Sequence, residues 1–546
     1  MNKFLKFVLL GLVCSSFFCA DYAMALETDF HGRVQSTYVL RDSDGLYHGF
    51  MDQVEGVQWR NELKFELTLR PEYEQYHTFT VDKVYLAYRG AYDAIFDCRE
   101  SEYESVREKS PDDFELGKDD LETENDLREA FVDFKAETDT QSAVLRVGRQ
   151  IVQWGEADGF NVVNIVNPQD NSVLMFFETP EDLATPLWMA RLNYSRGNIG
   201  PFRDFGLELL LVPDIRPHQF SALDDDMNAP YAFGFKYLKA LPFEHFFGLS
   251  VDNFEELLPG LASPLGNDAA LFKEDVPDSG FNNAEYGVKL QISLGQVAHA
   301  FHYYHGIQDD PAMDFSQLLS GGTLTFRHPE QDMYGYSFNT FVRPLNAIFR
   351  GEGCLVDKVA LLDLTGVTGI DEGWLSSHGF GSTQDFIESL VGGTTNLPIS
   401  SLEGSKGYVK RKVYYGLLGL DVDRFIKPLN KKCMIHTSWQ VYMRHIHDWS
   451  WNSRYRPFHE QDNYRLTTYW WTDYWNGRIH PEMFLMYDPE GVWMTMASVK
   501  YTKDYRWYYK LTQMSFWGNK DATSDFTQPV DLRPTSEISF RIGYNW

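Results

Sequence analysis

The carboxyl-terminal stretch, residues 536–546, constrains the fold of this chain more than any other part of it. Apolar side chains alternate with polar or small ones through the stretch, and the apolar positions are Ile538, Phe540, Ile542, Tyr544 and Trp546. A β-strand points successive side chains to opposite faces, so this stretch has one apolar face and one polar face. Its length matches the roughly 9–11 residues that a tilted strand needs to cross a bilayer. We therefore predict a membrane-spanning β-strand.

The last residue of this strand is the aromatic Trp546. An alternating strand with a terminal aromatic residue resembles the signal by which the barrel-assembly machinery recognises and inserts bacterial outer-membrane barrels. The candidate residues of this insertion signal are Phe540, Tyr544 and Trp546. A soluble β-sandwich also contains alternating strands, but its polar face meets bulk water, whereas the polar face of a wide barrel lines a lumen.

The amino terminus has the pattern of a secretory signal peptide, with a basic start, an apolar run and a small-residue cleavage motif. These parts are Lys3 and Lys6, residues 7–18, and Ala23-Met24-Ala25. We predict a signal peptide at residues 1–25 and a single mature domain at residues 26–546. The alternative is a retained anchor, for which the run is short against the roughly 20 residues of a spanning helix. In an exported chain, Cys98, Cys354 and Cys433 allow one disulfide or three unpaired thiols.

Strict alternation recurs along the whole chain, as a barrel requires. Clear cases are residues 62–70 and residues 285–294, where apolar side chains occupy every second position. We count about 16 such strands, with a range of roughly 14 to 18, as in large outer-membrane barrels. A single all-β domain of this size is ordinary for such barrels. The sequence therefore predicts an all-β fold, one large antiparallel transmembrane β-barrel in the cell outer membrane of a Gram-negative bacterium.

Three long segments do not fit spanning strands. Residues 91–127 are strongly acidic, residues 214–283 are rich in Pro, Asp and Asn, and residues 351–405 mix Gly, Ser and Thr. Extracellular loops of such barrels are long and periplasmic turns are short. We predict that all three are extracellular loops. The alternative is that one of them folds inward as a constriction or plug.

Charge and motif content exclude several classes of function. The formal net charge of −29 at pH 7 argues against nucleic acid as a partner, because the chain has a large excess of acidic groups over basic ones. The sequence has no G-x-S-x-G elbow of a nucleophilic serine. Neither the acidic run Asp224–Asp226 nor the pair His445 and His447 has the spacing of a metal-binding motif. We therefore predict no enzymatic activity, no cofactor and no metal.

One short motif follows the strand predicted near residues 143–150. It combines a cation, an aromatic residue and an anion with residues that favour turns. An Arg149–Glu156 ion pair inside a barrel would be stronger than one on the surface, because the lumen is partly shielded from bulk water. Such a pair either pins an inward-folded turn or lines the route of a solute. The candidate path or constriction residues are Arg146, Arg149, Trp154, Glu156 and Asp170, and the motif turn comprises Gly148, Gln150, Gly155, Asn167 and Pro168.

This G-R-Q-x-x-x-W-G-E and N-P-x-D pattern resembles a proteobacterial outer-membrane family known as the domain of unknown function 1302 family. The resemblance implies a porin-like barrel that works with an RND-type transporter and a periplasmic lipid carrier. It also implies an outer-membrane channel for small hydrophobic molecules that resemble lipids, steroids or hydrocarbons. Outer-membrane lipid and lipopolysaccharide are the other partners that we expect.

Two further functions remain open from the residues alone. The first is a diffusion porin for hydrophilic solutes, with a preference for cations because the predicted loops are acidic. The second is a structural or adhesive surface barrel whose long loops bind a target outside the cell. A lumen with apolar patches would favour a channel for hydrophobic cargo over both the diffusion porin and the surface barrel.

Overall fold

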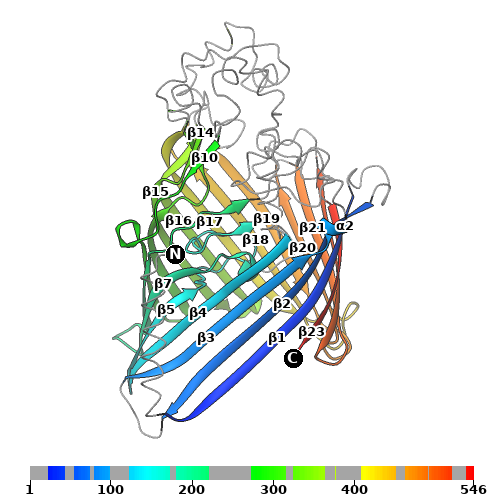
Figure 1. Cartoon of the computed structure of the whole chain (residues 1–546), viewed down its shortest axis with the longest axis horizontal. Helices are drawn as coiled ribbons and strands as arrows, with labels where there is room; N and C mark the ends of the chain where they lie inside the picture. Colours follow the sequence, from blue (N-terminus) through cyan, green and yellow to red (C-terminus); the bar gives the residue numbers. More distant parts are fainter. Residues whose placement is uncertain are drawn as a thin grey trace.

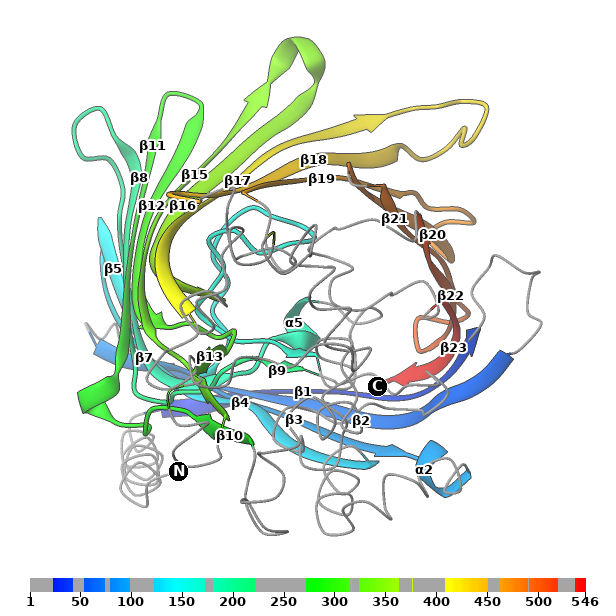
Figure 2. The same ribbon diagram turned by 90° about the horizontal axis from the view of Figure 1, so that it is seen from above.

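The computed structural model describes most of the barrel and some of its connections. The described residues are 23–42, 54–73, 79–98, 122–171, 180–220, 272–314, 316, 324–362, 376, 408–449, 461–489, 491–518 and 536–546. Within them, antiparallel strands form one ring (Figures 1 and 2). The predicted all-β barrel is therefore confirmed.

The barrel has 18 strands, each hydrogen-bonded to its neighbours, and β1 pairs with β23 to close the ring. In chain order they are β1 (Ala23–Asp42), β2 (Val54–Tyr73), β3 (Phe79–Asp93), β4 (Thr123–Thr138), β5 (Gln141–Gln150), β7 (Leu187–Arg196), β8 (Arg203–Val212), β11 (Glu285–Leu294), β12 (Val297–Ile307), β15 (Glu330–Val342), β16 (Ala347–Leu362), β17 (Tyr408–Arg424), β18 (Ile435–Ile446), β19 (Asp462–Trp471), β20 (Ile479–Asp488), β21 (Val492–Thr502), β22 (Trp507–Gly518) and β23 (Ser536–Asn545).

Short elements lie in the connections between barrel strands. One small sheet joins β10 (Phe272–Asp275), β13 (Ala312–Asp314) and β14 (Leu324–Arg327), and another joins β6 (Asp170–Asn171) and β9 (Gln219–Phe220). The helical turns are α2 (Ile95–Cys98), α5 (Pro180–Leu183), η4 (Phe281–Asn283) and η5 (Arg343–Leu345). In the described residues, no helix is both long enough and apolar enough to span a membrane.

The two faces of the wall differ as the alternation predicts. On β23, Phe540 is 50% exposed on the outer face, whereas Glu537 and Ser539 are buried on the inner face. Large apolar side chains also project outward on other strands around the ring, among them Phe30, Leu211, Leu418 and Leu511. A closed barrel with an apolar outer face satisfies all its backbone hydrogen bonds within a bilayer. This confirms the predicted location in the outer membrane.

The two rims are told apart by their turns. Neighbouring strands are joined by tight turns at residues 139–140 and 295–296, on the rim where β23 ends. Short turns mark the periplasmic side of such barrels, and the long connections mark the extracellular side. Residues 1–22 of the predicted signal peptide lie outside the described residues, and β1 begins at Ala23.

The strand count lies at the top of the predicted range because one strand, β16, lacks the alternation of apolar and polar residues by which strands were predicted. Strand β16 continues to Leu362 and so occupies the start of the segment 351–405 that was predicted to be a loop. Gly351 and Gly353 interrupt its alternation, and a register shift between Val356 and Val359 changes its phase. Strands β3 and β4 likewise extend into the ends of the predicted loop 91–127. Cys98, Cys354 and Cys433, the three cysteines within the described residues, are free.

Candidate functional site

The connection from β5 to β7 turns into the barrel instead of staying at the rim. We call its described residues, 151–171 and 180–186, the lumenal segment. Figure 2 shows its coil inside the ring, beside β16 and β17, with α5 nearer the centre. An inward-folded turn at the motif was one of the two interpretations of that motif. Much of the three predicted long loops lies outside the described residues.

The first half of the lumenal segment packs against the wall through an apolar core. Val152, Trp154, Val162, Val163 and Val166 are all buried there. Their wall partners lie on seven strands and are Leu187, Met189, Leu210, Val212, Tyr304, Met333, Cys354, Val356, Val359, Leu361, Val413, Leu417, Tyr442 and Ile446. The inner face of a water-filled barrel is polar, so this apolar inner wall is a specific seat for the segment.

Trp154 is the largest side chain in this seat, and it is only 2% exposed. Its indole Nε1 donates a hydrogen bond of 2.7 Å to Glu208 on β8, and Arg191 donates one of 2.6 Å to the same carboxylate. Its ring lies edge-on to Tyr304, with 6.0 Å between ring centroids. A buried indole that keeps a partner for its N–H is well held. Trp154 therefore anchors the segment and is not accessible to a solute.

The tip of the segment is held by a polar network on three wall strands. Arg350 of β16 donates a hydrogen bond of 2.9 Å to Asp158, and it also pairs with Asp421 of β17 at 3.0 Å. Ser438 and Gln440 of β18 donate to the same Asp158 carboxylate at 2.9 and 2.8 Å. Several charge-assisted hydrogen bonds on one carboxylate fix its position strongly. The tip is thereby tied to β16, β17 and β18 together.

The bend before the tip depends on Gly155 and a neighbouring carboxylate. Gly155 has a φ of +89°, and a Cβ atom at this position would overlap the Glu352 carboxylate. The Glu156 backbone N–H donates to Glu352, and the Glu156 side chain accepts a hydrogen bond of 2.9 Å from Asn339. Glycine adopts this left-handed conformation without a steric penalty. The motif glycine thus allows the segment to approach β16 closely.

The two halves of the segment are joined at their base by Asn167. Its side-chain oxygen accepts from the Val152 N–H at 2.7 Å, and its amide nitrogen donates to the Thr185 carbonyl at 2.8 Å. The Thr185 N–H in turn donates to the Pro168 carbonyl at 2.7 Å. A buried amide that satisfies several backbone groups specifies one conformation. Asn167 and Pro168 of the motif therefore form the neck of the segment.

The second half of the segment contacts the opposite part of the wall. Arg128 of β4 donates to the Ala184 carbonyl at 2.8 Å, and Arg89 of β3 donates to the Asp182 carbonyl at 3.3 Å. Lys64 of β2 lies 3.7 Å from the Asp182 carboxylate. Since the tip of the first half is held by β16, β17 and β18, the connection reaches from one side of the lumen to the other. Such a crossing narrows the barrel.

A histidine supports the end of the first half, outside the membrane-spanning strands. The Gln169 N–H donates a hydrogen bond of 2.7 Å to Nδ1 of His218. Burial lowers the pKa of His218 below its ordinary value, because a charged ring loses its hydration there. The neutral ring keeps Nδ1 free to accept. In the described ranges, no group of three or more His, Cys, Asp and Glu side chains is placed to hold a metal ion.

The structure separates the candidate residues that the sequence grouped together. The predicted Arg149–Glu156 pair is wrong, because Arg149 pairs with Asp126 at 3.0 Å and Glu156 contacts Asn339 on another strand. Arg146 stays on the wall, where it pairs with Asp133 at 2.7 Å and lies over the Phe131 ring.

The remaining candidates lie within or beside the connection. Asp170 lies in β6, beyond the neck, and Gln150 is buried at the end of β5. Gly148 is seated against the backbone of β4. Sequence reasoning missed Asp158, Arg350, Glu352 and Gln440, which are far apart in the chain and belong to no local motif.

Apolar side chains also line the inner wall next to the tip. Phe484 of β20 lies 3.6 Å from the position of a Cβ on Gly159, and it pairs in register with Met496 of β21. Phe160 packs edge-on against Tyr442 at 5.3 Å between centroids. Phe160, Phe484 and Met496 are only partly buried. We call these three residues the apolar patch, and the inward-facing methionines around it are Met486, Met494 and Met514.

Comparison with solved structures finds matches of low sequence identity. OccAB3 of Acinetobacter baumannii is 9% identical, with 95% of this chain and 99% of that chain covered and a TM-score of 0.42. OccAB4 of the same organism is 8% identical, with 95% and 98% covered and a TM-score of 0.43. OccK8 (OprE) of Pseudomonas aeruginosa is 9% identical, with 95% and 98% covered and a TM-score of 0.39.

Comparison at the level of sequence gives the family. No curated protein matches the chain. The family model described as "Protein of unknown function (DUF1302)" matches residues 42–546, which include the whole lumenal segment and its wall partners. The family suggested by the motif is thus confirmed, and this outer-membrane β-barrel belongs to the DUF1302 family.

Proposed function

We propose that the protein is an outer-membrane channel for small hydrophobic molecules that resemble lipids, steroids or hydrocarbons. The observation that supports this most directly is the apolar patch of Phe160, Phe484 and Met496, which is partly exposed inside the barrel at the constriction. A barrel that passes hydrophilic solutes has a polar inner face. An apolar surface beside the segment that crosses the lumen favours apolar cargo, because water there is easily displaced.

The side chains around the patch suit cargo of varied shape. Met486 and Met494 are direct neighbours on β20 and β21, and Met514 follows on β22 beside Met496. Methionine is unbranched and polarizable, so it adapts to different apolar surfaces. The Arg465 guanidinium lies 4.9 Å from the Phe160 ring centroid and offers a polar contact at the edge of the patch. This combination fits apolar molecules that carry a single polar group.

A charge in the apolar patch is expected to block this cargo selectively. In proteoliposomes, Met496→Glu should reduce the flux of a labelled long-chain alkane about tenfold, because desolvating a carboxylate costs more than about 1.4 kcal/mol. Uptake of sucrose, followed by vesicle swelling, should stay the same or rise. Met434→Glu is the matched control, since Met434 lies in the turn before β18 and is 37% exposed. Unchanged alkane flux with reduced sucrose uptake would sink the proposal.

A diffusion porin for hydrophilic solutes is the second candidate, and the inner faces of β1 to β5 favour it. Arg33 pairs with Glu62 at 2.9 Å, and Arg89 pairs with Glu124 at 2.6 Å. These charges largely neutralise each other, so they give the lumen little net preference for cations. The flux experiment separates the two functions, because a hydrophilic pore passes sucrose and not the alkane.

A periplasmic lipid carrier, acting with an RND-type transporter, is the partner that we propose on the inner side. The support is the long hairpin of β1 and β2. Strand β23 pairs with β1 only from Arg33 onward, and residues 26–31 of β1 pair with β2 alone among the described strands. Phe30 on this extension is 52% exposed. An open strand edge is a place where a partner can add its own strand.

The extension can be probed directly in intact cells. A photo-cross-linking residue at Phe30 should give adducts with a soluble periplasmic protein, because this position lies beyond the end of β23 on the periplasmic side. The same residue at Leu418, which is 55% exposed on the wall, is the control and should give adducts with lipid. Lipid adducts alone at Phe30 would contradict a docking role.

A further inference from the structure

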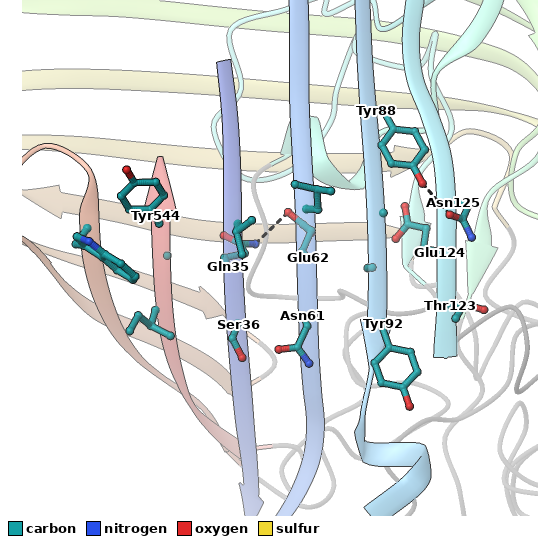
Figure 3. A pocket seen from close by; sticks show the side chains of 17 residues that line it. Gln35, Ser36, Asn61, Glu62, Tyr88, Tyr92, Thr123, Glu124, Asn125 and Tyr544 are labelled. Carbon is teal, nitrogen blue, oxygen red and sulfur yellow. Dashed lines mark hydrogen bonds between the residues drawn. The ribbon is translucent and has the colours of Figure 1, made fainter. Parts of the chain in front are cut away.

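The outer surface of the barrel contains a hollow at the seam where the ring closes. It has a volume of about 550 Å³ and lies on β22, β23, β1, β2, β3 and β4. Figure 3 shows labelled residues of this hollow, which belong to β23, β1, β2, β3 and β4. Val34 and Leu63 in its lining are 47% and 40% exposed, in phase with the other outward-facing residues of β1 and β2. The hollow therefore faces the membrane, not the lumen.

Strand register explains the shape of the hollow. One row of paired residues crosses the sheet at right angles to the strands, and a second row runs beside it. The first row is Ile542, Ser36, Asn61, Tyr92 and Thr123, and the second is Trp507, Tyr544, Val34, Leu63, Gly90 and Asn125. Gly90 has no side chain, and the Tyr88 side chain lies beside its position, 3.1 Å from where a Cβ would be. The hollow is a trough along these two rows.

The dimensions of the trough match one lipid chain. Six strands spaced by about 4.8 Å give it a length of roughly 24 Å. Because strands of such barrels are tilted by roughly 45°, the trough climbs about 17 Å through the membrane, close to one leaflet of a hydrocarbon core about 30 Å thick. A single extended acyl chain therefore fits its length and its volume.

The chemistry of the trough changes along its length. The end on β22 and β23 is aromatic and aliphatic, whereas the end on β3 and β4 carries polar groups. There Tyr88 donates a hydrogen bond of 2.7 Å to Asn125, and Thr123 lies at the start of β4, toward the extracellular rim. At the centre, Ser36 accepts a hydrogen bond of 3.3 Å from Trp59. Polar groups on a lipid-facing wall are costly unless they have partners.

We infer that this trough is a specific binding site for one outer-leaflet lipid, with an acyl chain lying between the two rows and the polar part at Asn125 and Thr123. The bilayer is the medium in contact with this face, so a lipid is the molecule that fills it. The polar end lies toward the extracellular rim, which selects the outer leaflet. This site is separate from the channel, and the inference holds whether or not the proposed cargo is right.

Photo-labelling with a defined lipid tests the site. The probe is phosphatidylethanolamine with a diazirine at the end of one acyl chain, in vesicles of the same lipid without label. Labelling near Val34 and Ile542 should exceed labelling near Leu418, on the wall across the ring, by about tenfold, because hydrogen bonds and close packing hold the bound lipid in place. Figure 2 shows that β1 and β17 lie on opposite sides of the ring.

Two variants separate loss of the site from loss of the fold. Gly90→Leu fills the trough at this position, and labelling should fall to the level of the opposite wall. Its Cβ would lie 3.1 Å from the Tyr88 hydroxyl and 3.2 Å from the Tyr88 ring, so this one side chain has to move and no backbone does. Asn125→Leu removes the polar end without filling the trough, and labelling near Val34 and Ile542 should fall in this variant as well. Gly353→Leu, at an outward-facing glycine of β16, should leave it unchanged. All three should keep the heat-modifiable migration of a folded barrel.

The inference is overturned by either of two results in the folded wild-type protein. One is equal labelling of both walls, which would mean that the trough holds ordinary boundary lipid. The other is an adduct between two protomers through the trough, together with a dimer in solution, which would make a second copy of the chain its occupant. Loss of alkane flux in Met496→Glu with unchanged trough labelling would leave the inference intact.

Discussion

Replacing Gly155 with valine is expected to lift the lumenal segment off the barrel wall. Valine with a φ near +89° is strained by about 1–3 kcal/mol. Its Cβ would also overlap the Glu352 carboxylate and come within 2.7 Å of Val163. Both penalties disappear when the segment leaves its seat. The wall strands make their own hydrogen bonds, so the barrel itself should remain folded.

The thiol of Cys354 reports this movement. It is 6% exposed and lies under the segment, 3.2 Å from the Val162 carbonyl oxygen. With Cys98 and Cys433 changed to serine, a polar maleimide should label Cys354 at least about tenfold faster in Gly155→Val than in the parent, because about 1.4 kcal/mol changes an opening equilibrium tenfold. Single-channel conductance should rise in parallel.

Gly197→Val provides the matched control for this substitution. Gly197 lies between β7 and β8, and a Cβ there meets no atom within 4 Å. Labelling of Cys354 in this variant should equal that of the parent. Slow labelling in Gly155→Val, in a barrel that still shows heat-modifiable migration, would show that the segment does not depend on its glycine.

The barrel wall could be predicted from the sequence because its pattern is local. Successive positions of β23 face the lipid and the lumen in turn, so apolar residues such as Phe540 and Tyr544 recur at every second position. This spacing alone predicts the strand and its outer face. Strand β16 breaks this rule. Its inner face is seated against the lumenal segment instead of water, and its outer face carries Gly351 and Gly353. A strand with apolar residues inside and glycine outside has no alternation to detect.

The candidate site was only half visible for a related reason. Gly155, Asn167 and Pro168 were recognisable because the conformations that they favour are properties of single residues. Their partners are not local. Glu352 is distant in the chain from Gly155, and only closure of the ring brings β16 beside the segment. The mistaken Arg149–Glu156 pair has the same origin, since nearness in sequence was taken for nearness in space.

The second prediction with a large expected effect concerns the polar network that holds the tip of the lumenal segment. Arg350→Met should release the tip from the wall, because Asp158 and Asp421 lose the cation that lies between them. Breaking a buried ion pair by removing one partner costs about 3–5 kcal/mol. Asp158 is 44% exposed at its side chain, and water can solvate it, so about 1–3 kcal/mol is the expected cost here. The open channel should then fluctuate between two conductance levels.

A double-mutant cycle identifies the cause of that change. Asp158→Asn removes the other end of the same ion pair, so Arg350→Met combined with Asp158→Asn should release the tip no further than Arg350→Met alone. Arg146→Met is the control, because Arg146 makes an equally close ion pair, with Asp133, but lies on the wall away from the tip. It should keep a single conductance level. Additive effects of the two tip variants would show that Arg350 acts on the lumen as a free charge and not as an anchor.

A tip held by three strands in this way ties the width of the constriction to the arrangement of β16, β17 and β18. A molecule that separates these strands would therefore also open the channel.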